Sequence, residues 1–188
     1  MSATTNRSFW QDKTGVPGII RETPIPSTLA QDEVLVKDIA GTVERVGSGP
    51  SSQRFKAGDR VLGYAMGEPS LSKPENGAFQ DYVVLDHALA VKIPDSLSFA
   101  EAAVFPLCLA TAGHALFGPK YLALPLPKAP GAPRTGKSVL VWGGASGVGS
   151  NAVQLAKAAG FDVLATCSPR NFGYVRGLGA DKVFDYNR

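Results

Sequence analysis

The chain has 188 residues, of which 44% are hydrophobic and 19% charged, a composition typical of a globular protein and not of a disordered one. Its net charge of +3 is weak and its lysines and arginines are scattered, which argues against a nucleic-acid partner. The sequence shows neither an apolar run of about 20 residues nor a signal peptide, so we expect a cytoplasmic protein without a membrane partner. The two cysteines, Cys108 and Cys167, are too few for a disulfide framework and are interpreted as small buried hydrophobic residues.

The first half of the chain has the pattern of a small β domain. Residues 1–32 are polar and rich in proline and glycine, and we interpret them as an arm with one short strand. Strands this short and closely spaced indicate a small antiparallel barrel or sandwich. The apolar runs that predict these strands lie at residues 34–36, 39–46, 60–64, 78–85 and 88–93.

An alanine- and leucine-rich stretch, residues 98–117, predicts a helix. Ser98 and Glu101 have the spacing of a capping box, which places the start of the helix at Ser98. Pro106 should divide the helix into two pieces, because proline lacks the N–H group that the helix needs. Residues 121–136 follow as a loop with four prolines: Pro125, Pro127, Pro130 and Pro133.

The pattern then changes to one of alternating strands and helices. Continuous apolar runs predict buried strands, and the helical segments between them give the order β-α-β-α-β. This order predicts a parallel sheet whose third strand is the last in the chain. The strands are predicted at residues 138–142, 161–166 and 181–186, and the helices at residues 148–159 and 171–177.

The strongest chemical signal is the glycine-rich turn between the first of these strands and its helix, residues 142–149. A turn at this place brings backbone N–H groups and the positive end of a helix to the diphosphate of a dinucleotide. The alternative is a tight turn whose glycines serve packing only. The predicted cofactor-binding residues of the turn are Gly144, Ala145, Ser146, Gly147, Val148 and Gly149.

The end of the second strand distinguishes the two nicotinamide cofactors, because NAD sites usually place an acidic residue there. Here the only nearby acid, Asp162, lies at the opposite end of the strand. Ser168 and Asn171 offer neutral polar groups, and Arg170 offers a guanidinium suited to phosphate. We therefore predict NADP(H) over NAD(H), the alternative being that Arg170 is only a solvated residue at a helix start.

Other patterns match nucleotide, hydrolase or metal sites only in part. Residues 131–138 fit the letters of a P-loop, but they precede a strand instead of opening a helix, and Pro133 removes an N–H group from the phosphate cradle. Ser146 lacks the second glycine of an esterase elbow and a histidine partner. His87, His114 and the two cysteines show no metal-ligand spacing, so we predict no metal site.

Several longer segments carry a family resemblance: residues 76–84, 91–103, 166–171 and 179–186. Together with the glycine-rich turn they resemble the medium-chain dehydrogenase/reductase superfamily, and within it the zinc-independent branch of fungal enoyl reductases and quinone reductase-like proteins. The resemblance implies an α/β-plus-β fold. It consists of a GroES-like β-barrel catalytic domain at residues 1–117 with its arm at 1–32, a proline-rich loop at 118–137, and the first half of a Rossmann domain, a doubly wound parallel sheet that binds NADP, at 138–188.

The same resemblance implies an NADPH-dependent reductase that transfers a hydride to an enone, an enoyl thioester or a quinone without zinc. Thr111 and Ala112 would line the nicotinamide and substrate cleft, although Thr111 also has the alternative of an ordinary helical threonine bonded to its own turn. No proton donor can be named. The residues implied for the cofactor are 145–148 at the diphosphate, Ser168, Arg170 and Asn171 at the 2′-phosphate, and Tyr186 near the adenosine.

Two departures from the family pattern bear on activity. Lys37 runs directly into Asp38, where family members carry an additional active-site segment. The chain also has three of the six Rossmann strands, which leaves residues 139–142 as a free edge of the sheet. We therefore expect low solubility, self-association through this edge or a fragment of a longer product. A truncated, catalytically inactive NADP-binding fragment is the alternative to an active enzyme.

Overall fold

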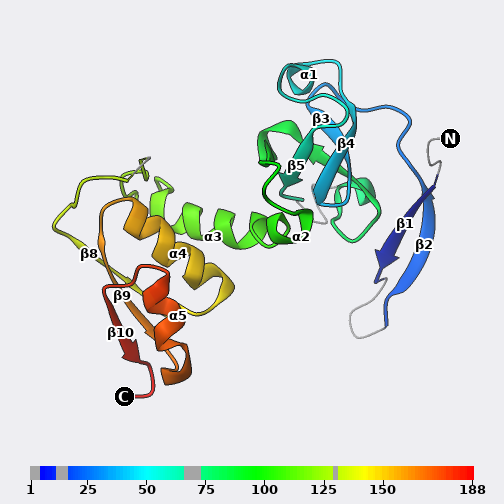
Figure 1. The fold of residues 1–188 in the computed structure, drawn as a ribbon. Helices are drawn as coiled ribbons and strands as arrows, with labels where there is room; N and C mark the ends of the chain where they lie inside the picture. Colours follow the sequence, from blue (N-terminus) through cyan, green and yellow to red (C-terminus); the bar gives the residue numbers. More distant parts are fainter. Residues whose placement is uncertain (1–4, 12–16, 66–72, 129–130) are drawn as a thin grey trace. The chain divides into compact units, whose positions relative to one another are not determined.

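The computed structural model describes residues 5–11, 17–65, 73–128 and 131–188 (Figure 1). It divides into two compact units, Met1–Pro106 and Leu107–Arg188, which are described separately. The second unit therefore includes the helix that ends at Phe117, which the sequence analysis grouped with the N-terminal domain. Residues 69–72 of a predicted turn and Pro130 of the proline-rich loop lie outside the described residues.

An antiparallel five-stranded sheet forms the centre of the N-terminal unit, in the order β6-β3-β4-β5-β7. Its core is rich in buried valines, such as Val34, Val36 and Val83, and the middle residues of β3 and β6 are buried on both faces. The predicted strands are confirmed, except that the run predicted at 78–85 begins as a strand only at Tyr82. The five strands are β3 (Glu33–Lys37), β4 (Ala40–Val46), β5 (Arg60–Gly63), β6 (Tyr82–Asp86) and β7 (Ala90–Lys92).

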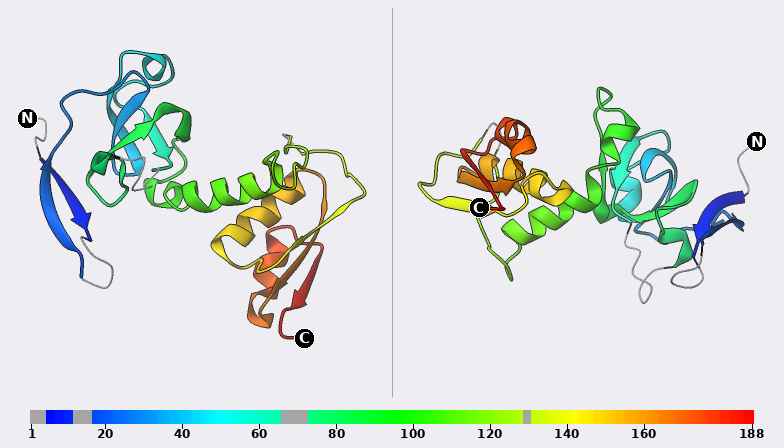
Figure 2. Two further views of the ribbon diagram at one scale, coloured as in Figure 1. Left: turned by 180° about the vertical axis from the view of Figure 1, so that it is seen from behind. Right: turned by 90° about the horizontal axis from the view of Figure 1, so that it is seen from below.

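The amino-terminal arm is a two-stranded hairpin of β1 (Thr5–Trp10) and β2 (Ile19–Pro24), where the sequence analysis expected one short strand (Figures 1 and 2). The residues that β1 buries are polar, Asn6 and Ser8, so hydrophobic periodicity could not reveal it. The Asn6 side chain donates to the Tyr82 carbonyl and accepts from the Tyr82 N–H, each at 2.9 Å. This side chain therefore fastens the hairpin to β6.

A tight turn connects β3 to β4 directly. Asp38 takes a left-handed conformation with φ of 63°, which is uncommon for residues other than glycine but more frequent for aspartate than for most. Gly41 is required just beyond it, because a Cβ there would lie 1.7 Å from the Lys37 carbonyl oxygen. The turn thus joins β3 to β4 at the position where the family resemblance implies an additional active-site segment.

The predicted helix at 98–117 forms in two pieces, α2 (Phe99–Ala102) and α3 (Pro106–Phe117), as the proline predicted. The capping box of Ser98 and Glu101 is confirmed in both directions. By length and composition, Phe99–Phe117 would suffice to cross a membrane, although the sequence analysis expected no such run. This is weak evidence for a span, because core helices of soluble proteins pass the same test and turn residues interrupt the segment after Ala102. A further short helix, α1 (Pro50–Arg54), lies where only a turn was expected.

The C-terminal unit contains a parallel sheet in the order β10-β9-β8, formed by β8 (Ser138–Val141), β9 (Asp162–Cys167) and β10 (Lys182–Asp185). Helices α4 (Gly147–Ala158) and α5 (Phe172–Gly177) connect the strands, as predicted. Both helices pack on one face of the sheet, because Val153 of α4 and Val175 of α5 share a core with the inward side chains of all three strands. As predicted, β8 is an edge strand of this sheet.

The docking of the hairpin can be tested through Asn6. We expect Asn6→Ala to lower the free energy of unfolding by about 1–3 kcal/mol, because it leaves the partly buried N–H and carbonyl of Tyr82 without their Asn6 partner. Urea denaturation measures the change. Asn187→Ala, at an exposed position near the C-terminus, is the matched control and should change it by less than about 0.5 kcal/mol. Equal effects of the two substitutions would contradict this role for Asn6.

Candidate cofactor-binding edge

The candidate cofactor residues of the C-terminal unit lie at one edge of the parallel sheet. The carboxyl ends of parallel strands meet at the same edge, and each of the three strands leads there into a candidate segment. The glycine-rich turn follows β8, the 3₁₀ turn η3 (Pro169–Asn171) follows β9, and Tyr186 follows β10. The topology thus brings together residues that are up to 42 positions apart, from Gly144 to Tyr186.

The glycine-rich turn is anchored to β9 through its backbone. The Gly143 N–H donates to the Thr166 hydroxyl at 3.1 Å, and the Gly144 N–H donates to the Thr166 carbonyl at 2.8 Å. Gly143 has a φ of 78°, which favours glycine. Gly144 is buried, and a Cβ there would lie 3.0 Å from the Ala165 Cβ. These two glycines therefore serve the turn and its packing, which was the alternative considered for the sequence pattern.

The first turn of α4 presents backbone donors that have no acceptor. Ser146 is the N-cap, and its hydroxyl accepts from the Gly149 N–H at 3.0 Å. Within the described residues, the N–H groups of Ala145, Gly147 and Val148 make no hydrogen bond. Because α4 has 12 residues, its aligned peptide dipoles add a partial positive charge at this end. The arrangement fits a bound anion, since three N–H groups without an acceptor lie within four residues of each other at the positive end of a helix.

The segment after β9 is polar and contains no acid. Asn171 donates from its side-chain amide to the Ser168 hydroxyl at 3.1 Å, which shapes the turn between them. Arg170 is exposed and makes no hydrogen bond or ion pair in the part of the chain that the structure describes. Asp162, at the opposite end of β9, is paired with Arg134 at 2.6 Å. A free guanidinium and neutral polar groups therefore stand where an NAD site would place a carboxylate.

The remaining candidates differ in accessibility. Tyr186 is 45% exposed just beyond β10. Thr111, on α3, is exposed, and its hydroxyl donates to the Leu107 carbonyl at 2.8 Å, which is the ordinary helical bond considered as the alternative for this residue. Ala112 is 1% exposed, so it has little surface to offer a cleft.

The two cysteines occupy different environments. Cys167 is buried at the end of β9, and this burial raises the pKa of its thiol above the ordinary value. It fits the expected description of a small buried hydrophobic residue. Cys108, on α3, is half-buried and lies against the glycine-rich turn. In the described segments, no group of three or more His, Cys, Asp or Glu side chains is placed to hold a metal ion.

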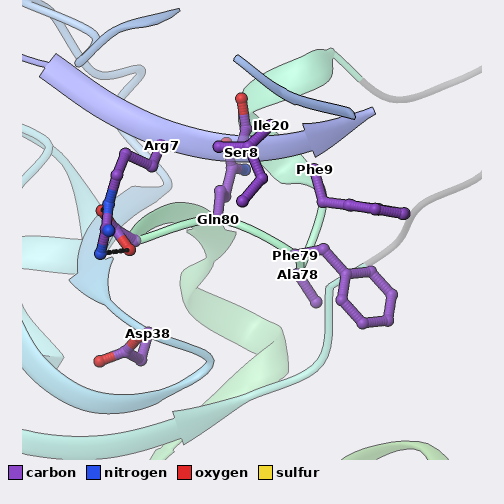
Figure 3. Close-up of a pocket in the computed structure, with 9 residues that line it drawn as sticks. Arg7, Ser8, Phe9, Ile20, Asp38, Ala78, Phe79 and Gln80 are labelled. Carbon is purple, nitrogen blue, oxygen red and sulfur yellow. Dashed lines mark hydrogen bonds and ion pairs between the residues drawn. The ribbon is translucent and has the colours of Figure 1, made fainter. Parts of the chain in front are cut away.

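The N-terminal unit has an open pocket of about 410 Å³ between the hairpin and the segment before β6 (Figure 3). Phe9 and Phe79 stand edge to face at 6.4 Å along one side, and Asp38 lies at another. Arg7 donates to the Asp81 carboxylate at 2.8 Å, and this hydrogen bond holds the pKa of Asp81 below its usual range. Sequence reasoning missed the pocket because it depends on a hairpin whose buried residues are polar.

Comparisons with known proteins find similar proteins along most of the chain. The alcohol dehydrogenase GroES-like domain matches residues 6–95. A dehydrogenase, pigH, from Monascus ruber is 53% identical over 154 residues, which cover 81% of this chain. The chain belongs to the medium-chain dehydrogenase/reductase superfamily. The chain is also similar to the trans-enoyl reductase himH from Aspergillus japonicus, with 45% identity over 151 residues, or 79% of this chain.

The match extends to solved structures and has a clear limit in length. Mycobacterial Rv1454c, whose structure contains NADPH, is 27% identical with a TM-score of 0.66, and the match covers 97% of this chain and 59% of that one. The chain spans only about four tenths of the length of the curated relatives, 41% of pigH and 42% of himH. Membership of the superfamily therefore describes the fold and the family of this chain, and its activity remains a proposal.

The N-cap of α4 can be tested through Ser146. We expect Ser146→Ala to lower the free energy of unfolding by about 0.5–2 kcal/mol, because the Gly149 N–H loses its acceptor. Ser146→Asp keeps a capping oxygen and should remain close to the wild type in the same urea titration. If the alanine and aspartate variants were destabilised equally, Ser146 would not act through its cap.

Proposed function

We propose that this chain binds NADP(H) at the carboxyl edge of its parallel sheet. Two features of this edge carry the proposal: among the described residues, three N–H groups at the start of α4 have no acceptor, and the guanidinium of Arg170 has no partner. A dinucleotide with a 2′-phosphate presents anions at two separate points, and these two features offer a partner for each. The NADPH in the mycobacterial relative supports the same cofactor class.

The residues divide the cofactor among them. Ala145, Gly147 and Val148 donate their N–H groups to the diphosphate, while Gly144 and Gly149 shape the turn that presents them. Ser146 holds the helix end in place through its cap. At the other anion, Arg170 pairs with the 2′-phosphate and Ser168 and Asn171 add polar contacts, with Tyr186 beside the adenosine. These segments follow β8, β9 and β10 in turn, so their residues would hold the adenosine half of the cofactor along the carboxyl edge of the sheet.

For the architecture as a whole, we propose a reductase that acts on an activated double bond or a quinone. The trans-enoyl reductase among its relatives supports this class of reaction. NADP(H) supplies a hydride when bound. The chain's own contribution is to orient the cofactor and to shield it, with Thr111 on α3 as the polar candidate for the nicotinamide and substrate cleft. We assign no role to zinc and place the protein in the cytoplasm.

A specific observation favours a second candidate, an NADP-binding fragment without turnover. The tight turn at Asp38 replaces a segment expected near the active site, and Ala112 is buried instead of facing a cleft. Following NADPH absorbance with an enone, an enoyl thioester and a quinone, alongside calorimetric titration of NADPH, distinguishes the two. Turnover that persists in the presence of a chelator supports a zinc-independent reductase. Binding without turnover supports the fragment, and the absence of binding would contradict both.

Cofactor choice can be tested through Arg170. We expect Arg170→Ala to weaken NADPH binding about ten- to a hundredfold, because a charge-assisted bond to the 2′-phosphate is lost, and to leave NADH binding unchanged. Lys182→Ala removes the same charge at the other end of the sheet and should leave NADPH affinity as it is. Calorimetry measures both. An equal loss for NADPH and NADH, or for both variants, would contradict a specific role for Arg170.

We also propose that the free edge of β8 mediates self-association. Leu140 is 63% exposed and Trp142 is 72% exposed beside this edge, and unpaired strand groups readily pair with a second copy. We expect Leu140→Lys to shift the protein toward monomer on a sizing column, because a charge on an edge strand opposes pairing. Val91→Lys, on the edge strand β7 of the other sheet, is the control and should leave the elution unchanged. A wild-type protein that elutes as a monomer at all concentrations would refute the proposal.

A further inference from the structure

The absence of a side chain at Gly147 is explained by its neighbour on α3. A Cβ at this position would lie 2.8 Å from the Cys108 sulfur, closer than such atoms approach in proteins. The backbone itself permits other residues here, since Gly147 is not among the residues with positive φ. Gly149 differs, because a Cβ there would meet the Gly143 carbonyl oxygen at 2.2 Å. The glycine at 147 therefore makes room for Cys108, whether or not a ligand approaches the turn.

Cys108 belongs to the inward face of α3. Cys108, Ala112 and Leu116 are spaced by four residues and so share one face of the helix. Ala112 is 1% exposed, and Leu116 is buried in the same core as Val153 of α4. α3 is thus fixed on the body of the unit by Leu116, and further along the same face Cys108 meets the first turn of α4. The small thiol sets how closely the two helices approach there.

We propose that Cys108 is a positioning residue for the cofactor turn. By filling the space in front of Gly147, its side chain holds the first turn of α4 where the N–H groups of Gly147 and Val148 can reach the diphosphate. The same contact ties this turn to α3, the helix that carries Thr111. This inference rests on the proposed binding of NADP(H) and adds that the fit between residues 108 and 147 sets the affinity for its diphosphate.

The test is a double-mutant cycle on NADPH affinity, measured by calorimetry on the full chain. We expect Gly147→Ala to weaken NADPH binding about tenfold, a loss typical of an overpacked contact, and Gly147→Ala with Cys108→Ala to recover most of it. The rescue is expected because a Cβ at 147 would be 3.9 Å from the Cys108 Cβ, an ordinary contact. Failure of Cys108→Ala to rescue Gly147→Ala would overturn the inference and assign Gly147 to the ligand instead.

Two further variants approach the contact from the other side. Cys108→Ser preserves the size of the side chain and should bind NADPH as the wild type does, whereas Cys108→Leu should weaken binding by pressing on Gly147. Gly177→Ala is the control, because it adds a Cβ to a helix where nothing lies within 4 Å. Equal affinities for Cys108→Leu and the wild type would also overturn the inference.

A third readout separates positioning from general loss of structure. Adenosine 2′-monophosphate carries the 2′-phosphate but no diphosphate, so Gly147→Ala should leave its binding unchanged while NADPH binding falls. A parallel loss of both ligands would mean that the contact only supports folding. If the wild type binds neither ligand, the proposed function itself fails. In that case the melting temperatures of the same four proteins in the cycle still report the packing contact, but the positioning role is refuted.

Discussion

The candidate site depends on how the chain leaves β8. The Gly143 and Gly144 N–H groups are satisfied by Thr166 of the neighbouring strand, so the turn is fixed to the sheet before α4 begins. The next donors, on Ala145, Gly147 and Val148, then have no acceptor within the described residues. Backbone groups of this kind and the helix dipole together make an anion site without any charged side chain. The specificity for a second anion has to come from elsewhere, and we propose that Arg170 provides it.

The sequence predicted much of the fold because its hydrophobic pattern coincides with real burial. The valines of β3 to β10 alternate or cluster as the two sheets require, and the capping box at Ser98 and the proline at 106 mark helix boundaries by local chemistry. The hairpin escaped prediction for the opposite reason. β1 buries Asn6 and Ser8 and satisfies them by hydrogen bonds to residues about 75 positions away or across the hairpin, which no local pattern reveals.

Prediction of the site was uneven for similar physical reasons. Strand-turn-helix context located the edge where Ser146, Ser168 and Tyr186 come together, since parallel topology determines where strands end. It could not show what each glycine is for. Gly144 is packed against β9, Gly149 lies close to the Gly143 carbonyl oxygen, and Gly147 lies close to the Cys108 sulfur. The glycine spacing that resembles a ligand-binding fingerprint therefore also serves close packing. The burial of Ala112 likewise follows from the face that α3 turns inward, which the sequence did not specify.

The central claim is that the three unpartnered N–H groups at the start of α4 receive the diphosphate of NADP(H). Titration of the ¹⁵N-labelled protein with NADPH, followed by amide NMR, tests it residue by residue. We expect the amide protons of Ala145, Gly147 and Val148 to move downfield together as they gain an acceptor, with Arg170 and Ser168 perturbed at the other end of the cofactor. Unchanged resonances for these three amides at saturating NADPH would contradict the account.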